Sequence, residues 1–193
     1  MSPQRSNRSS LIDGTVRCLE RLPPERVTAR AIAAESGANL ASIAYHFGSK
    51  DDLVTEAVIE GLDRWLAEVD RAMEGLAPAG PRERFRRAAQ VFDASRARHT
   101  GLAKNFVAAL ARAQHDPRVR EILAEGYRRT RPSVAAILGL GEDRAGEDAA
   151  GLTLALFHGL MFQTLLDPTL AIEGRRMVSA EARFAELLPD RSR

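Results

Sequence analysis

The feature of the sequence that most constrains the fold is a series of helix start and stop signals in residues 27–53. Thr28 is a good N-cap, because its hydroxyl can accept a hydrogen bond from a free backbone N–H of the first turn. Gly37 suits the left-handed conformation in which many helices end, and Asn39 can cap a following helix. Ser49 opens an S-x-x-D capping box that starts a third helix. The stretch therefore predicts two short helices joined by a tight turn, with a further helix directly after them.

The spacing of small and apolar residues in this stretch predicts how the two short helices pack. Ala33 is small enough for a crossing helix to approach, Gly37 lies in the turn, and Ile43 faces back toward the first helix. Two short helices that cross through a glycine-containing turn are typical of a helix-turn-helix. From spacing alone, an ordinary corner between two helices with no role in DNA binding is the alternative.

The residues of the second short helix carry a more specific signal. The segment Ser42–Lys50, SIAYHFGSK, resembles the recognition-helix signature of the TetR/AcrR family of bacterial transcriptional regulators. That signature combines a hydroxyl residue, a large apolar residue, aromatic residues, His, Phe, a small residue, Ser or Asn, and Lys. Ala44 departs from it, because this position is often a tyrosine that touches DNA. The resemblance extends from about Leu11 to Leu53, and it implies a three-helix DNA-binding head followed by a domain that binds a ligand.

The residues expected to contact DNA follow from helix-turn-helix geometry, in which the second helix enters the major groove. Lys50 lies at a helix N-terminus, where free N–H groups and the helix dipole already favour a phosphate. Leu40 and Ala41 offer only apolar contact, for example to a thymine methyl group. Tyr45 and His46 can add hydroxyl and imidazole donors to the DNA backbone. We expect DNA contacts from Thr28, Arg30, Asn39, Leu40, Ala41, Ser42, Tyr45, His46 and Lys50.

Charge and the single cysteine add weaker constraints. The chain has 28 Lys and Arg against 26 Asp and Glu, a net charge of +2 that by itself does not indicate nucleic acid. Through Lys50, seven basic and four acidic residues give +3, so the excess lies at the front. Arg5 and Arg8 belong to a polar arm that either reaches the minor groove or is a solvated tail. Cys18 is expected to be a small buried hydrophobe. The polar first residues predict no signal peptide and a cytoplasmic protein.

The rest of the chain predicts more helices and hence an all-α fold. Ala, Leu and Arg dominate, aromatic residues make up only 5%, and a hydrophobic share of 45% is enough for a core. Pro132 is expected to kink or interrupt its helix. We expect a DNA-binding domain at residues 1–53, joined by a long helix to a ligand-binding and dimerisation domain at residues 54–193. The expected helices span residues 10–22, 28–36, 40–46, 50–73, 81–99, 101–113, 116–138, 148–166 and 179–188.

Residues 149–166 contain no charged side chain and reach the lower length limit of a membrane span. The polar residues within this stretch and its lack of basic flanks argue against a span. A helix that is apolar on all sides in a soluble protein is buried on all sides, so one face is expected against the core and the other against a second subunit. Gly151, Ala155 and Gly159 recur every four residues and are the expected dimer contacts.

The C-terminal helices are expected to enclose a cavity for an effector. The apolar character of these helices suits a largely apolar small molecule that one or two hydrogen bonds orient. Simple core packing is the alternative role for each aromatic residue. The candidate ligand contacts are Trp65, Phe92, His99, Asn105, Phe106, Tyr127, His158, Phe162 and Gln163.

No catalytic, cofactor or metal-binding motif is found. The four histidines are far apart in sequence and fit no H-E-x-x-H pattern, and neither a phosphate-binding glycine loop nor a nucleophile elbow is present. We therefore expect a homodimeric DNA-binding regulator, a repressor that a small-molecule effector releases from operator DNA. Two alternatives stay open: a helical protein-interaction module without DNA binding, and an enzyme or metal protein that uses the histidines.

Overall fold

The computed structural model describes residues 7–74 and 79–186, and in this part of the chain all regular structure is helical. The all-α fold predicted from the sequence is confirmed. The α-helices are α1 (Asn7–Arg21), α2 (Ala29–Ser36), α3 (Ala41–Phe47), α4 (Lys50–Arg71), α5 (Pro81–Arg96), α6 (Thr100–Arg112), α7 (Pro117–Leu138), α8 (Arg144–Leu166) and α9 (Gly174–Ala185). Short 3-10 turns lie at Pro24–Arg26 and Pro168–Leu170.

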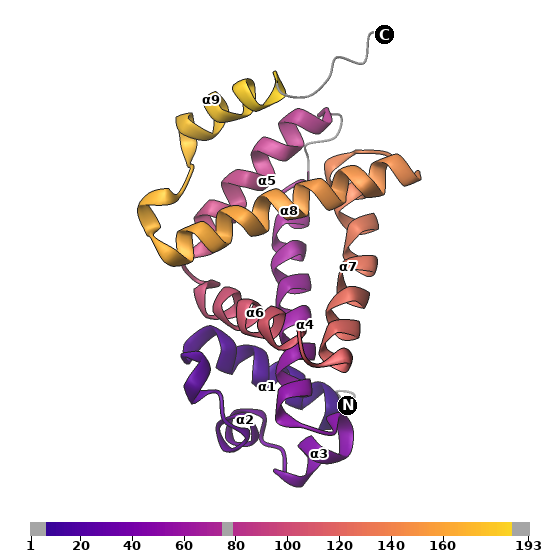
Figure 1. The fold of residues 1–193 in the computed structure, drawn as a ribbon, viewed down its shortest axis with the longest axis vertical. Helices are drawn as coiled ribbons and strands as arrows, with labels where there is room; N and C mark the ends of the chain where they lie inside the picture. The colour runs from indigo at the N-terminus through magenta and orange to yellow at the C-terminus, as the bar shows by residue number, and fades with distance from the viewer. Residues whose placement is uncertain (1–6, 75–78, 187–193) are drawn as a thin grey trace.

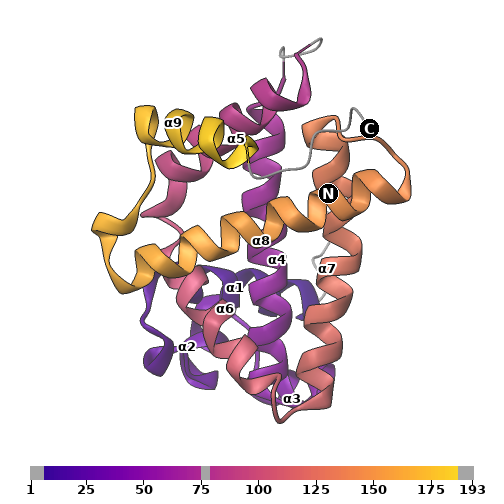
Figure 2. The same ribbon diagram turned by 45° about the horizontal axis from the view of Figure 1, so that its top comes forward.

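The first three helices lie together at one end of the molecule, and α4 extends from them through the middle of the body (Figure 1). Helix α7 runs beside α4, and α8 crosses in front of both in the two views (Figure 2). Helix α9 lies over α5, where Glu181 binds Arg82 and Arg86. Because α4, α6 and α7 each reach from the body to the first three helices, a movement in the body can be transmitted along them.

The capping signals of the sequence have the predicted effects at α2 and α4. The Thr28 hydroxyl accepts a hydrogen bond from the Ala31 backbone N–H at 3.2 Å, and Gly37 ends α2 in the left-handed region at φ 67°. The Ser49 hydroxyl accepts from the backbone N–H of Asp52 at 3.0 Å. The Asn39 side chain accepts from the backbone N–H of Ala41 at 3.0 Å. Helix α3 begins at Ala41, one residue after the predicted start, so its N-cap is Leu40 and the prediction of Asn39 as the cap is wrong.

Several predicted helix boundaries need correction. Helix α1 begins at Asn7, three residues before the predicted start. Helix α8 begins at Arg144, because the Asp143 carboxylate caps it by accepting from the Gly146 N–H at 2.9 Å. The predicted helix 81–99 ends at Arg96. Helix α9 covers residues 174–185 in place of the predicted 179–188. Residues 187 and 188 lie outside the described residues, and so does part of the loop predicted after the helix 50–73.

The predicted interruption at Pro132 is wrong, since α7 continues through it to Leu138. The residues that follow the proline, Val134, Ala135, Ile137 and Leu138, are buried, so packing holds the last turns of α7 in place despite the missing N–H donor. The largest buried cluster includes Leu11, Ile32, Phe47, Leu53, Val58, Trp65, Leu102, Phe106, Val119, Leu123 and Met161, and so connects the first three helices with the body.

Candidate nucleic-acid interface and ligand cavity

Helix α3 has one face in the core and the other in solvent. Ile43 and Phe47 are only 4% and 1% exposed and fix the helix against α1 and α4, whereas Tyr45 is 84% exposed. Leu40, just before the helix, is 47% exposed. The predicted DNA contacts on this element are therefore divided between fully exposed and half-buried positions. Leu40, Ala41 and Tyr45 are exposed, and Ser42 and His46 are half-buried.

The start of α2 and the turn after it supply the other predicted contacts. Thr28 is exposed, but its hydroxyl is already used as the cap of α2. Arg30 is exposed and makes no ion pair within residues 7–74 and 79–186, so its guanidinium is available to a phosphate or a base. Asn39 is exposed at the entry to α3. Arg8 of the predicted arm lies within α1, pairs with Glu56 and stands 5.0 Å from the centre of the Phe47 ring, and Arg5 lies outside the described residues.

Lys50, the predicted phosphate ligand, lies half-buried at the first position of α4. Its ammonium group is 2.6 Å from a carboxylate oxygen of Asp51. That contact, together with the nearby Arg112 guanidinium, lowers the pKa of the Asp51 carboxyl below its ordinary value. Lys50, the predicted phosphate ligand, is therefore already paired with a carboxylate in this structure.

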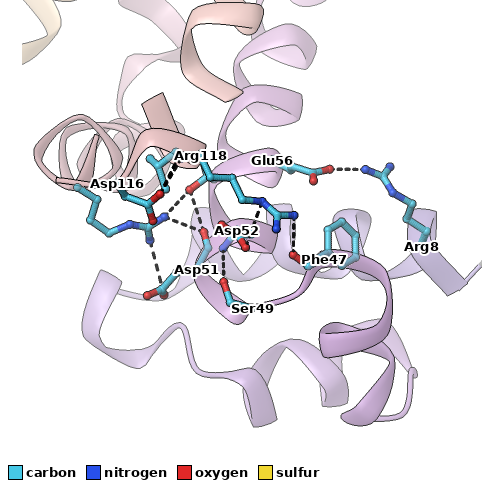
Figure 3. A network of polar contacts seen from close by, with 11 residues as sticks. Arg8, Phe47, Ser49, Asp51, Asp52, Glu56, Asp116 and Arg118 are labelled. Atoms are coloured by element: carbon cyan, nitrogen blue, oxygen red, sulfur yellow. Dashed lines mark hydrogen bonds and ion pairs between the residues drawn. The ribbon is translucent and has the colours of Figure 1, made fainter. Parts of the chain in front are cut away.

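Arg112 and Arg118 are the residues at this site that sequence reasoning missed. They come from the end of α6 and the start of α7, more than fifty residues after α3, and contact the junction between α3 and α4. Figure 3 shows Arg118 at this junction. Arg118 donates to the Phe47 carbonyl oxygen at 3.0 Å, and its guanidinium lies 3.4 Å from the Asp52 carboxylate. Sequence spacing gives no signal for such contacts, because more than fifty residues of the chain separate the partners.

A cavity of about 120 Å³ lies between α4, α5, α6, α7 and α8. Its wall is largely apolar and aromatic, and among its described lining residues only Asp63 has an ordinarily charged side chain. Five of the predicted ligand contacts line it, which brings together residues far apart in sequence. They are Trp65, Phe92, Phe106, Tyr127 and His158.

The other four predicted ligand contacts do not line this cavity. His99 stacks on Trp65 at 4.5 Å between ring centres with Nε2 3.5 Å from Glu68, and the Asn105 amide donates to the Gly101 carbonyl. Phe162 packs beside His158 at 6.2 Å between ring centres, and Gln163 is exposed. Helical periodicity could not separate these positions, because it places a residue on a face without showing which neighbour covers it.

Tyr127 and His158 form a polar pair in the cavity wall. The Tyr127 hydroxyl oxygen lies 3.0 Å from His158 Nδ1, and Nε2 has no hydrogen-bond partner in the described part of the chain. Burial lowers the pKa of His158 to about 4 and raises the pKa of Tyr127 above its ordinary value. Both groups are therefore neutral at pH 7, and the imidazole can offer one hydrogen bond to a bound molecule.

The outer face of α8 is apolar and exposed. Leu152, Leu156 and Leu166 are 75%, 38% and 85% exposed, and Ala155 is exposed among them. By length and composition α8 could span a membrane, and it is the one helix of the described residues for which this holds. Of the predicted dimer contacts, Ala155 and Gly159 have open space, whereas Gly151 lies against the Arg131 guanidinium of α7.

Family models match both parts of the chain. Residues 11–57 match the model for bacterial regulatory proteins of the tetR family, and residues 81–188 match the model for the C-terminal part of BetI-type transcriptional repressors. The first match covers α2 and α3 completely, and the second covers α5 to α9. No curated protein matches the chain.

Solved structures of transcriptional regulators share the fold. A regulator from Pseudomonas aeruginosa PAO1 has a TM-score of 0.64 at 24% identity, over 93% of this chain and 89% of that chain. The multidrug binding protein EbrR, complexed with imidazole, has a TM-score of 0.65 at 24% identity, over 98% of this chain and 94% of its own, and EbrR also has a structure with proflavin. A regulator from Saccharomonospora viridis in complex with choline has a TM-score of 0.55 at 24% identity, over 83% and 85% of the two chains.

The two family matches together cover the helix-turn-helix and most of the helical body. The second match alone spans more than half of the chain, and the similar folds extend over nearly its full length. The chain belongs to the TetR family of bacterial transcriptional regulators, and it is a non-enzymatic transcription factor with a helix-turn-helix DNA-binding domain.

Proposed function

We propose that this regulator is a repressor that binds operator DNA through α3 and is released by a small molecule bound in the cavity. The exposed outer face of α3, with Tyr45 84% exposed beside Leu40, Ala41 and Ala44, is the observation that carries the DNA-binding part. Arg30 near the start of α2 and Lys50 at the start of α4 supply cations for phosphate contacts. In this proposal residues 1–53 bind DNA, residues 54–193 bind the effector and dimerise, and the protein acts in the cytoplasm.

A homodimer is part of the proposal. One recognition helix buries too little surface for tight specific binding, so a two-fold dimer that reads two half-sites is expected. The exposed leucines of α8 support this, because a stripe of large apolar side chains in solvent is typical of a subunit interface. Ala155 and Gly159 lie where a second α8 can approach closely.

The proposed effector is a small, largely apolar molecule that His158 orients through one hydrogen bond. The apolar wall of the cavity and the neutral Tyr127–His158 pair support this class. Structures of EbrR with imidazole and proflavin, and of the Saccharomonospora viridis regulator with choline, support small-molecule binding in proteins of this fold. A cavity of about 120 Å³ is small for a drug-sized ligand, so binding is expected to move the surrounding helices apart.

Release of DNA then requires that the effector bind the DNA-incompetent arrangement more tightly than the DNA-bound one. The cavity is bordered by α4, α6 and α7. Helices α4 and α6 pack against α1, and α7 contacts the end of α3 through Arg118. Expansion of the cavity is therefore expected to change the position of the two recognition helices relative to each other.

Selection from a random-sequence duplex library tests the DNA-binding part. The wild-type protein is expected to enrich a site with two symmetric half-sites, and changes at Arg30 or Ser42 are expected to alter the enriched sequence. A library that shows no enrichment and a DNA titration that does not depend on salt would instead indicate a protein-interaction module.

A thermal-shift screen tests the effector part. Neutral apolar, cationic and multiply anionic compounds are compared, and each stabilising compound is then added to a titration of the selected duplex. We expect neutral apolar compounds to stabilise the protein and to weaken DNA binding. Stabilisation by multiply charged anions alone, or hits that leave DNA affinity unchanged, contradicts the proposed effector.

A further inference from the structure

Two arginines beside the α6–α7 turn, Arg112 and Arg118, donate hydrogen bonds to the junction between α3 and α4. Arg118 is labelled in Figure 3. Arg112 donates to the Asp51 carbonyl oxygen at 2.8 Å and to the Thr55 hydroxyl at 2.5 Å. Arg118 donates to the Phe47 carbonyl oxygen at 3.0 Å. Two of these acceptors are main-chain carbonyls, so the arginines fix the backbone on both sides of Ser49, where α3 ends and α4 begins.

Asp51 connects this arrangement to the predicted phosphate ligand. One carboxylate oxygen, Oδ1, lies 2.6 Å from Lys50 Nζ and 3.6 Å from a guanidinium nitrogen of Arg112. The two cations therefore share one anion. Removal of Arg112 leaves Asp51 to Lys50 alone, which makes it harder for Lys50 to exchange the carboxylate for a phosphate.

The same helices also form the cavity wall. Phe106 on α6 and Tyr127 on α7 line the cavity, and the helices that carry them lead directly to Arg112 and Arg118. At about 1.5 Å per residue, the six and nine residues between them correspond to roughly 9 and 14 Å of helix. A shift of either helix at the cavity thus moves an arginine at the junction.

We propose that Arg112 and Arg118 are positioning residues, an arginine clamp through which the α6–α7 turn holds the α3–α4 junction and sets how freely Lys50 reaches a phosphate. The Lys50 part rests on the proposed function, whereas the hold on the junction does not. Through this clamp, a shift of α6 or α7 at the cavity would change the position of the DNA-binding face.

Amide hydrogen exchange of the full chain tests the hold on the junction without DNA. Arg118→Ala is expected to speed exchange of the amides of residues 44–52 by about tenfold, because local opening no longer breaks charge-assisted hydrogen bonds. Arg118→Lys keeps the charge but cannot contact Phe47 and Asp52 with two nitrogens at once, so it is expected to restore protection only in part. Arg128→Ala is the matched control, because Arg128 lies on the same helix and, within residues 7–74 and 79–186, pairs only with Glu121 and Glu125 of α7.

A double-mutant cycle with the selected duplex tests the role of Asp51. Arg112→Ala is expected to weaken DNA binding by about threefold to tenfold in the wild-type background and by less than about twofold in Asp51→Asn, since contacts that share a partner are not additive. A general loss of positive charge would give the same factor in both backgrounds.

The outcomes separate the inference from the proposed function. Exchange in Arg118→Ala that equals exchange in Arg128→Ala overturns the clamp, and additive effects of Arg112→Ala and Asp51→Asn overturn the link to Lys50. A Lys50→Ala variant with wild-type DNA affinity contradicts the proposed DNA contact instead. The hydrogen-exchange experiment then still decides whether the arginine clamp exists, because it is done without DNA.

Discussion

The hydroxyl oxygen of Tyr127 on α7 lies 3.0 Å from Nδ1 of His158 on α8. This pair lies in a largely apolar and aromatic cavity wall that also contains Asp63, Thr130 and Thr153, and His158 packs beside the rings of Phe106 and Phe162. Burial disfavours the imidazolium form and lowers the pKa of His158 to about 4. His158, for which the sequence allowed either a core role or a ligand role, is thus a neutral group whose Nε2 has no hydrogen-bond partner among the described residues.

His158 is expected to make the protein less stable in acid. Its pKa in the folded state lies below the unfolded value of 6.5, so between about pH 6.5 and pH 4 the unfolded chain binds more protons. The contribution of the neutral imidazole is complete above pH 6.5 and is lost as the pH falls toward 4, by at most about 3 kcal/mol. Urea unfolding of the wild type and of His158→Gln at fixed protomer concentration measures it. Parallel pH profiles for the two proteins would contradict this assignment.

Asp93 is expected to have the opposite effect, making the protein more stable as the pH falls. Burial and the nearby charge of Glu173 raise the pKa of this carboxyl from 3.8 to about 6. Its contribution to the free energy of unfolding is therefore fully present below pH 3.8 and is lost as the pH rises through 6. Asp93→Asn is therefore expected to raise the free energy of unfolding at pH 8 by about 1 kcal/mol, once screening of a partly exposed group is allowed for, and to change it little at pH 3.5. Glu83→Gln, an exposed acid of the same helix, is the control. An equal effect of Asp93→Asn at both pH values would show that charge is not the cause.

Gly101 marks the close contact between α6 and α1. A Cβ atom at this position would lie 2.0 Å from the Leu19 carbonyl oxygen, which is main chain and cannot move aside easily. Gly101→Ala is expected to lower the free energy of unfolding by about 1–3 kcal/mol, as overpacking typically does. Gly80→Ala, where nothing lies within 4 Å, is the control for the chemical change itself. Equal urea midpoints for the two variants would refute the close contact.

Local signals predicted the head better than the body. Thr28, Gly37 and Ser49 each act within a few residues of the chain, so their caps could be assigned from sequence. The need for a glycine at position 101 of α6 could not be predicted, because the close approach that requires it comes from α1. Pro132 looked like a break, but buried residues beyond it hold α7 together.

The residues of the site were likewise predicted where the signal is local, and missed where the contacts come from distant parts of the chain. The exposed positions of α3 follow from the alternation of Ile43 and Phe47 with polar or small residues along one short helix. Arg112 and Arg118 could not be predicted, because their acceptors include main-chain carbonyls that no sequence pattern marks. Helical periodicity predicted that Tyr127 and His158 face the interior, but it could not show that the two side chains contact each other.

The apolar face of α8 is expected to form the dimer interface. Ala155→Arg would place a charge among exposed leucines, and it is expected to give a folded monomer because the substituted position is exposed in the single chain. Ala108→Arg, at an exposed position of α6, is the control and is expected to remain dimeric. Sedimentation and circular dichroism measure assembly and folding. A dimeric Ala155→Arg protein, or a wild type that is monomeric at micromolar concentration, would rule out this interface.

The salt dependence of DNA binding by Lys50→Ala tests the central claim most directly. A phosphate contact contributes the release of about one counterion, so the slope of log affinity against log salt is expected to fall by about one unit per subunit. Because a phosphate carries no sequence information, the loss is expected on the selected duplex and on random duplexes alike. Arg128→Ala removes the same charge far from α3 and is expected to keep the wild-type slope. An unchanged affinity and slope in Lys50→Ala would contradict the account.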